Sequence, residues 1–294
     1  MAIESGLETW LDIVEATAAK IEAAQRVGSR SPTGKRLTAE MERKMTAYFR
    51  TIEKTFPMAK VLALYEKKLP PEIKEASVEA DFLLMFTEWL DGSDELLASI
   101  FTDSIADGNA AGVEGTLAEW LDVFGIKPPE NMDLQTFIPD SVIEKARKTA
   151  AARVKDVDQE TIDRIAGQVA DALENRSTTA ELAKTIGETF DSMSKSRAKL
   201  IAQTELNTAI NDGVKAANIE VGADEKEWNE PYSADVPRDV HIANMGDGRI
   251  PIDDAFSGDD STDAGSGNNN PLNCHCTTLY YGATEEAVAK MLGL

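Results

Sequence analysis

Apolar residues recur at helical spacing through the first two thirds of the chain. Four of them, at offsets of 4, 11 and 15 from the first, share one face of a predicted helix: Leu37, Met41, Tyr48 and Ile52. Polar and basic residues occupy the other faces, and Arg36, Arg43 and Arg50 recur every seven residues with Lys54 one turn later. The pattern therefore predicts an amphipathic helix with one apolar face and one basic face.

Turn-forming and helix-breaking residues divide this helical region. The run Ser31-Pro32-Thr33-Gly34 is typical of a turn before the helix, and Pro57 should end or kink it. Further breaks are expected at Leu69-Pro70-Pro71, Asp107-Gly108, Lys127-Pro128-Pro129 and Pro139-Asp140. We therefore expect several helices of moderate length before residue 141.

After residue 140 the helical pattern is sharper. One apolar stripe consists of Ile162, Ile165, Val169 and Leu173. Thr178-Thr179-Ala180-Glu181 is a capping box, in which the Thr178 hydroxyl and the Glu181 carboxylate satisfy amides of the first turn. The helix that follows carries Leu182, Ile186 and Phe190 on one face.

A second helix start is expected near Asp191. Its apolar stripe is Leu206, Ile210, Val214 and Ala217. Polar residues crowd the same helix, which is unusual for a helix that must also pack: Gln203, Thr204, Glu205, Asn207 and Asn211.

Past Gly222 the helical period disappears. The stretch Ser257 to Asn270 is acidic, rich in Gly, Ser and Asn and almost without apolar side chains, so it predicts a flexible loop. Alternation from Cys274 to Tyr281 predicts a strand. The expected fold is mostly α, with an extended helical N-terminal region (1–140), a second region (helices 141–220 and a small α+β part 221–284) and a C-terminal tail (285–294).

Composition limits the class of protein. With 294 residues and 42% apolar content the chain is long enough for two folded domains. No apolar run approaches the length that spans a bilayer, and the N-terminal residues lack the pattern of a secretory signal. Two cysteines do not make a disulfide scaffold, which favours a reducing compartment and the cytoplasm at the time of synthesis.

The net charge of −22 opposes indiscriminate binding to nucleic acid or anionic membranes. Its distribution is uneven, however. Segment 26–68 holds eleven basic and four acidic residues, segment 70–140 two and sixteen, and segment 221–272 three and twelve. The basic face of Arg36, Arg43, Arg50 and Lys54 is thus either an ordinary solvated surface or a patch for nucleic acid or an acidic partner.

Every cysteine and histidine lies within residues 241–276. Two thiolates and an imidazole are ligands that Zn²⁺ favours, so His241, Cys274 and Cys276 are a candidate zinc site, with Asp235, Asp239 or His275 as a fourth ligand. The alternative is a pair of buried, reduced cysteines beside a hydrogen-bonded histidine. A disulfide between Cys274 and Cys276 is disfavoured by the geometry of such close neighbours.

Catalytic interpretations have less support. Glu205 could act as an acid or base, but no nucleophile, base and orienting group can be assembled around it, so we expect the polar residues of its helix to hydrogen-bond adjoining loops. Asp239-Val240-His241, Asn273 and His275 suggest a metal-dependent nuclease, in which one histidine activates water. The acidic stretch between them would repel phosphate.

Six motifs in order resemble the phage head-morphogenesis family, also called the Mu protein F-like minor head proteins. The segment Arg176 to Ala183 is followed by Thr204-Glu205 with Asn211 and Gly213 downstream, and then by Trp228. Arg238-x-x-His241, Gly248-Arg249-Ile250-Pro251 and Pro271-Leu272-Asn273-Cys274-His275-Cys276 complete the series. The chain departs from the family at Gln203 and His275, where relatives carry arginine, and many relatives have Cys-x-x-Cys where this chain has Arg238-x-x-His241. The resemblance covers residues 141–284.

The resemblance implies a non-enzymatic minor head protein of a tailed phage or prophage. Such a protein is expected to bind the portal protein, with the scaffold, the major capsid protein and packaged DNA (through segment 26–68) as further partners. It would lie inside the head of the virion near the portal, after assembly in the host cytoplasm, and influence DNA packaging or ejection. The alternatives are a nuclease or hydrolytic effector using His241 and His275, and a soluble interaction protein that shares the module.

Overall fold

The structure, a computed structural model, describes residues 31–68, 75–91, 93–229, 238–258 and 276–294. The first helices are α2 (Pro32–Thr55), α3 (Met58–Lys68), α4 (Glu75–Leu90) and α5 (Asp94–Phe124). A 3₁₀ turn, η1 (Leu134–Phe137), precedes α6 (Asp140–Glu174) and α7 (Thr179–Ser192), and a π-helical segment η2 (Met193–Arg197) leads into α8 (Ala198–Glu220).

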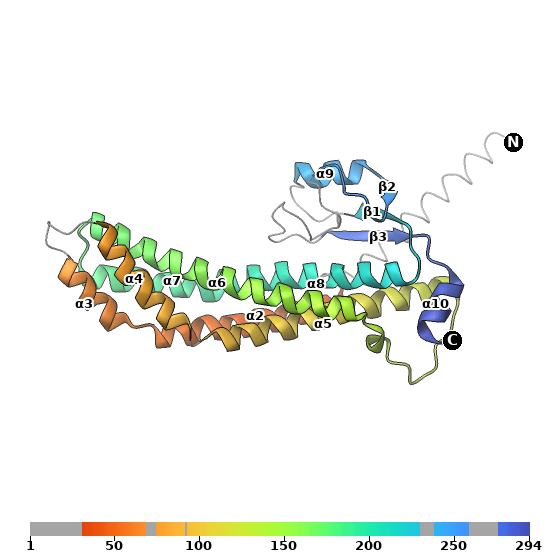
Figure 1. Ribbon diagram of the computed structural model, residues 1–294, viewed down its shortest axis with the longest axis horizontal. Coiled ribbons are helices and arrows are strands. Elements are labelled where there is room, and N and C mark those ends of the chain that lie inside the picture. The colour runs from red at the N-terminus through yellow and green to blue at the C-terminus, as the bar shows by residue number, and fades with distance from the viewer. Residues whose placement is uncertain (1–30, 69–74, 92, 230–237, 259–275) are drawn as a thin grey trace. The chain divides into compact units, whose positions relative to one another are not determined.

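A small α+β part follows α8. It consists of β1 (Glu225–Asn229), α9 (Asp239–Gly246), β2 (Arg249–Pro251) and β3 (Thr277–Tyr281), and the chain continues into α10 (Glu285–Leu292). The three strands form one antiparallel sheet in the order β2-β1-β3. This confirms the predicted fold class: a mostly helical chain with a small α+β module near its C-terminus (Figure 1). Segment 285–294, expected as a tail, contains helix α10.

The sequence signals at helix ends are mostly confirmed. Pro57 separates α2 from α3, and α5 ends before Pro128. Thr178 forms the predicted capping box with Glu181. The run from Ser31 to Gly34, however, is the first turn of α2 instead of a turn before it. The Ser31 hydroxyl accepts a hydrogen bond of 3.0 Å from the Gly34 amide, and Pro32 occupies the first helical position, where its missing N–H costs nothing.

The predicted break at Asp107-Gly108 is wrong. Helix α5 runs through both residues, because Gly108 is used for packing and not for a turn. A Cβ atom added at Gly108 would lie 2.7 Å from the Ala209 Cβ of α8, closer than real atoms approach. The glycine therefore permits the two helices to pack closely, a reason that local sequence does not reveal.

A new helix start near Asp191 was also expected and is not seen. The backbone stays helical and passes through the π-helical segment η2. This segment carries Arg197, whose guanidinium is buried and donates to the Thr161 hydroxyl, the Val157 carbonyl and the Glu160 carboxylate. The extra residue of the π turn therefore coincides with a buried cation whose two terminal nitrogens are both hydrogen-bonded.

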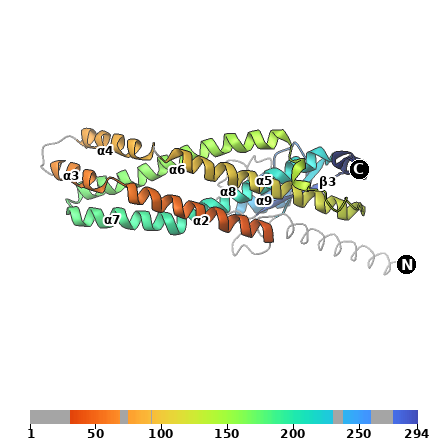
Figure 2. The same cartoon turned by 90° about the horizontal axis from the view of Figure 1, so that it is seen from below.

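The described chain divides into two compact units that interleave in sequence. One unit comprises residues 40–103 and 147–202, and the other comprises 104–146, 203–294 and the chain up to residue 39. We call them the helical unit and the module unit. Within the helical unit, α3, α4, α6 and α7 lie side by side (Figure 2). Its core is aromatic: the Phe56 ring lies 5.9 Å from Phe86, 5.0 Å from Trp89 and 5.3 Å from Phe190.

In the module unit, α5, α8 and α10 share an apolar core. The buried residues of this core are Val113, Leu117, Leu121, Ala217, Val221, Val288 and Leu292. The predicted apolar stripe of α8 is buried, and Ile210 and Val214 pack against Tyr280 of β3. The sheet thus lies alongside α8, as Figure 1 shows. In the described part of the chain no helix combines the length and apolar character that crossing a membrane requires.

Candidate functional site

The α+β part of the module unit brings His241 and Cys276 together. Helix α9 places His241 on its buried face, and Cys276 directly precedes β3, so both side chains are almost completely buried. The Cys276 Sγ lies 3.3 Å from the His241 Nδ1. Two residues that are 35 positions apart in sequence therefore form a buried thiol–imidazole pair.

Aromatic rings enclose this pair. The Trp228 ring of β1 lies 5.3 Å from the His241 ring and 5.2 Å from the Phe256 ring. The ammonium group of Lys226, which has no solvent exposure, lies 5.2 Å from the centre of the Phe256 ring. No sequence pattern indicated Lys226 or Phe256, since a strand lysine is usually exposed and a single phenylalanine after a turn forms no pattern.

Helix α8 contributes hydrogen bonds to the same place. The Asn211 amide donates to the Cys276 carbonyl over 3.0 Å and the Asn207 amide does so over 3.4 Å. Among the described residues, the Asn207 Oδ1 and the Trp228 Nε1 are buried without a hydrogen-bond partner. Asn207 and Asn211 of α8 thus bond to the backbone that leads into β3, and for Thr204 and Glu205 the predicted bonds to adjoining loops stay a prediction.

The remaining motif residues also lie in or beside this module. Thr204 and Glu205 are buried in α8. A Cβ atom added at Gly213 would collide with the backbone carbonyl of Asn109 in α5, so this glycine permits a close approach of two helices. Arg238 is the residue before α9, with an extended backbone. The motif residues from Thr204 to Arg238 therefore lie in the module unit, whereas the first motif segment, Arg176 to Ala183, lies in the helical unit.

The His241–Cys276 pair fits two of the three predicted zinc ligands. Tetrahedral coordination at ordinary Zn–S and Zn–N lengths would separate a sulfur and a nitrogen by about 3.5 Å, close to the 3.3 Å of the pair. Cys274, the third predicted ligand, lies outside the described residues, as do Asp235 and His275. Within the described ranges no group of three metal-ligating side chains is present. Of the residues in the nuclease hypothesis, Asp239 and His241 lie in α9, and Asn273 and His275 lie outside the described residues.

The basic face of α2 is a continuous surface feature of that helix. The side chains of Arg36, Arg43, Arg50 and Lys54 are all exposed, while Leu37, Met41, Tyr48 and Ile52 are buried as predicted. Helical geometry puts the first three about 10 Å apart along the axis, since seven residues rise by that amount. The four cationic side chains thus form an exposed row along α2.

A second titratable cluster, in the helical unit, was not predicted. The Tyr48 hydroxyl donates to the Asp158 carboxylate over 2.8 Å. Burial raises the pKa of Asp158 to about 7, the Tyr48 hydrogen bond opposes this, and the hydrogen bond and negative charge of Asp94 add to it. Tyr48 reads as an ordinary core residue in the helical pattern, so its acidic partner gave no sequence signal.

Comparison with known proteins finds the predicted family within the C-terminal part of the chain. Residues 163–279 match the family model described as phage Mu protein F like protein. These residues include α8, β1, α9, β2 and the first part of β3, so this part of the chain is similar to the phage Mu F-like proteins. Neither the curated proteins nor the solved structures gave a significant match.

Proposed function

We propose that this chain is a minor head protein of a tailed phage or prophage that binds the portal protein and acts in head assembly and in DNA packaging or delivery. The observation that carries the proposal is the family match over residues 163–279. The geometry supports it, because Asn211, Gly213, Trp228 and His241 of the motif series serve to build one compact module.

The interior of this module favours a structural role over an enzymatic one. Cys276 and His241 are buried beneath Trp228, whereas a catalytic pair must meet its substrate. Thr204, Glu205 and Asn211 are buried as well. We propose that the protein acts by binding other head proteins and DNA, and that it is not an enzyme.

Co-expression with the cognate portal protein tests this function. The full chain should be used, because the two units interleave in sequence and a truncation would cut through both. We expect a complex that survives affinity purification and size-exclusion chromatography, and no complex with the portal of an unrelated phage. Failure to bind portal, scaffold or major capsid protein at micromolar concentration would contradict the proposal.

A cleavage assay distinguishes the nuclease alternative. Double- and single-stranded DNA would be incubated with the protein and Mg²⁺, Mn²⁺ or Zn²⁺. The proposal predicts no cleavage above that of a His241→Ala variant. Metal-dependent cleavage that this variant lacks would establish an enzyme.

A further inference from the structure

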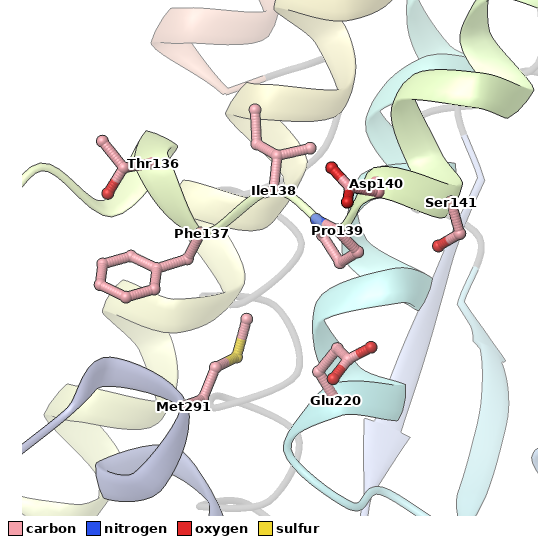
Figure 3. Close-up of a pocket in the computed structure, with 8 residues that line it drawn as sticks. All are labelled: Thr136, Phe137, Ile138, Pro139, Asp140, Ser141, Glu220 and Met291. Atoms are coloured by element: carbon pink, nitrogen blue, oxygen red, sulfur yellow. The ribbon is translucent and has the colours of Figure 1, made fainter.

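A surface pocket of 440 Å³ lies in the module unit. Neither His241 nor Cys276 is among the residues that line it. It is formed by η1, the start of α6, the end of α8 and α10. Figure 3 shows the Met291 side chain and the Glu220 carboxylate across the opening from the Pro139 ring, with Phe137 beside Met291. None of these residues belongs to the motif series.

The floor of the pocket is apolar and continuous with the core. Phe137, Ile138 and Met291 are only partly buried and pack on the buried cluster of α5, α8 and α10. Two large aliphatic side chains adjoin the lining in sequence and are exposed to solvent: Ile219 is 48% exposed and Ile143, one turn after Asp140, is 40% exposed. An exposed apolar group of this kind beside a hollow is typical of a protein-binding surface.

The polar groups of the pocket are anionic. Asp140 and Glu220 are exposed and have no ion-pair partner among the described residues. Glu220 ends α8, whose last turn holds no basic residue, so its charge adds to the negative end of the helix dipole. The pocket therefore offers apolar side chains and two carboxylates, Asp140 at the start of α6 and Glu220 at the end of α8, to the same ligand.

We propose that this pocket docks a basic segment of the portal protein, in which a large aliphatic or aromatic side chain enters the pocket and a neighbouring lysine or arginine pairs with Glu220 and Asp140. The inference rests on the proposed function for the identity of the partner. A second copy of this chain fits less well. The basic face of its α2 could supply charge, but the exposed large apolar residues of the described chain include none on α2, so that face lacks an anchor.

Binding of purified portal protein to immobilised full-length chain tests the proposal. Ile219→Asp and Glu220→Lys each change an exposed side chain, so folding should persist, which circular dichroism would check. Each should weaken portal binding at least tenfold. Two matched variants of exposed residues in the helical unit, Leu84→Asp and Glu174→Lys, should leave the affinity within twofold. Glu220→Gln should also flatten the salt dependence of binding, since it removes one screened charge pair.

The outcomes separate the two proposals. Portal binding that Ile219→Asp and Glu220→Lys do not weaken overturns the docking site and leaves the portal association intact. No portal binding by the unchanged protein overturns both. If sedimentation velocity shows self-association that Ile219→Asp abolishes while portal binding is unchanged, the surface joins copies of this chain and the proposal is wrong.

Discussion

The side-chain amide of Asn211 donates a hydrogen bond of 3.0 Å to the backbone carbonyl of Cys276, 65 residues further along the chain. Both groups are buried, so the bond fixes the start of β3 on α8 without competition from water. It gives a physical reason for an asparagine at this place of the motif series. A shorter side chain would not reach the Cys276 carbonyl, and a carboxylate would have no hydrogen to donate to it.

Asn211→Ala should therefore destabilise the protein by about 1–3 kcal/mol, the usual cost of leaving a buried acceptor without its partner. Asn207→Ala is the matched control. Its bond to the same carbonyl is longer and its Oδ1 lacks a described partner, so its removal should cost less. Urea unfolding followed by tryptophan fluorescence measures both. Equal losses of stability in the two variants would contradict the larger contribution assigned to the Asn211 hydrogen bond.

The close approach of α5 and α8 makes a second prediction. Gly213→Ala forces a methyl group against the Asn109 carbonyl and should cost roughly 1–3 kcal/mol through overpacking. Gly187→Ala is the control, because a Cβ atom there meets nothing within 4 Å. That substitution should stabilise helix α7 by about 0.5–1 kcal/mol. Thermal unfolding should thus shift in opposite directions for the two variants.

Asp158 makes the stability of the helical unit depend on pH. Burial, with the Asp94 hydrogen bond and charge, raises the pKa of Asp158 to about 7 in the folded state. The folded protein then holds a proton that the unfolded chain releases near pH 4. The stabilisation is complete below pH 4 and is lost as the pH rises through 7.

Asp158→Asn keeps an acceptor for the Tyr48 hydroxyl but cannot ionise. The difference in unfolding free energy between this variant and the unchanged protein should increase by roughly 1–3 kcal/mol when the pH is raised from 5.5 to 8.5, after allowance for partial exposure to solvent. Asp171→Asn, an exposed carboxylate on the same helix, controls for the loss of one charge. Urea titrations at both pH values measure the difference. A gain of the same size at both would contradict the assigned pKa.

Zinc bound by His241, Cys274 and Cys276 should remain at about one ion per chain after dialysis, as a structural site retains it. Elemental analysis measures this directly. Cys276→Ser should lose the metal, because an alcohol is a far poorer ligand than a thiolate. Asn244→Ala removes the acceptor of the Gly258 amide and disturbs α9 without touching a predicted ligand, so it should keep the metal. Metal-free protein from a purification without chelator would favour the reduced, hydrogen-bonded alternative.

The basic face of α2 predicts DNA binding that weakens steeply with salt, because each phosphate contact releases counterions. Replacing Arg36, Arg43, Arg50 and Lys54 by glutamine should reduce the logarithmic salt slope by up to about 4. Removing the same number of charges elsewhere, at the exposed Lys60, Lys67, Lys184 and Lys199, should change it far less. Fluorescence anisotropy of a labelled duplex measures both slopes. Absence of binding at low salt would identify the face as solvated surface.

Local patterns predicted the features that local physics decides. The capping box at Thr178 and the buried face of Leu37, Met41, Tyr48 and Ile52 depend on neighbours within a few residues, and both are confirmed. Gly108 shows the limit of this approach. The same residue that ends helices elsewhere sits inside α5, because the partner helix α8 comes close at that point.

The site was predictable to a similar degree. Clustering of cysteine and histidine in sequence predicted a common module, and the structure brings His241 to Cys276. The rings around them and the pocket at Glu220 and Met291 were not predicted, since they depend on elements far apart in the chain. The raised pKa of Asp158 could not be predicted for the same reason: it results from burial, together with Asp94, among helices that are remote in sequence.

Because the two units interleave in sequence, they can complete folding only in a fixed order as the chain is synthesised. The helical unit ends at residue 202, so all of its residues are available once that point of the chain has left the ribosome. The module unit must wait, because Val288 and Leu292 of α10 complete a core whose first members, Val113 and Leu117, were made long before. A nascent chain therefore carries the second half of α5 with an incompletely covered apolar face until α8 and then α10 have been made. During that interval the chain depends on the early-folding helical unit, and on chaperones, to stay out of aggregates.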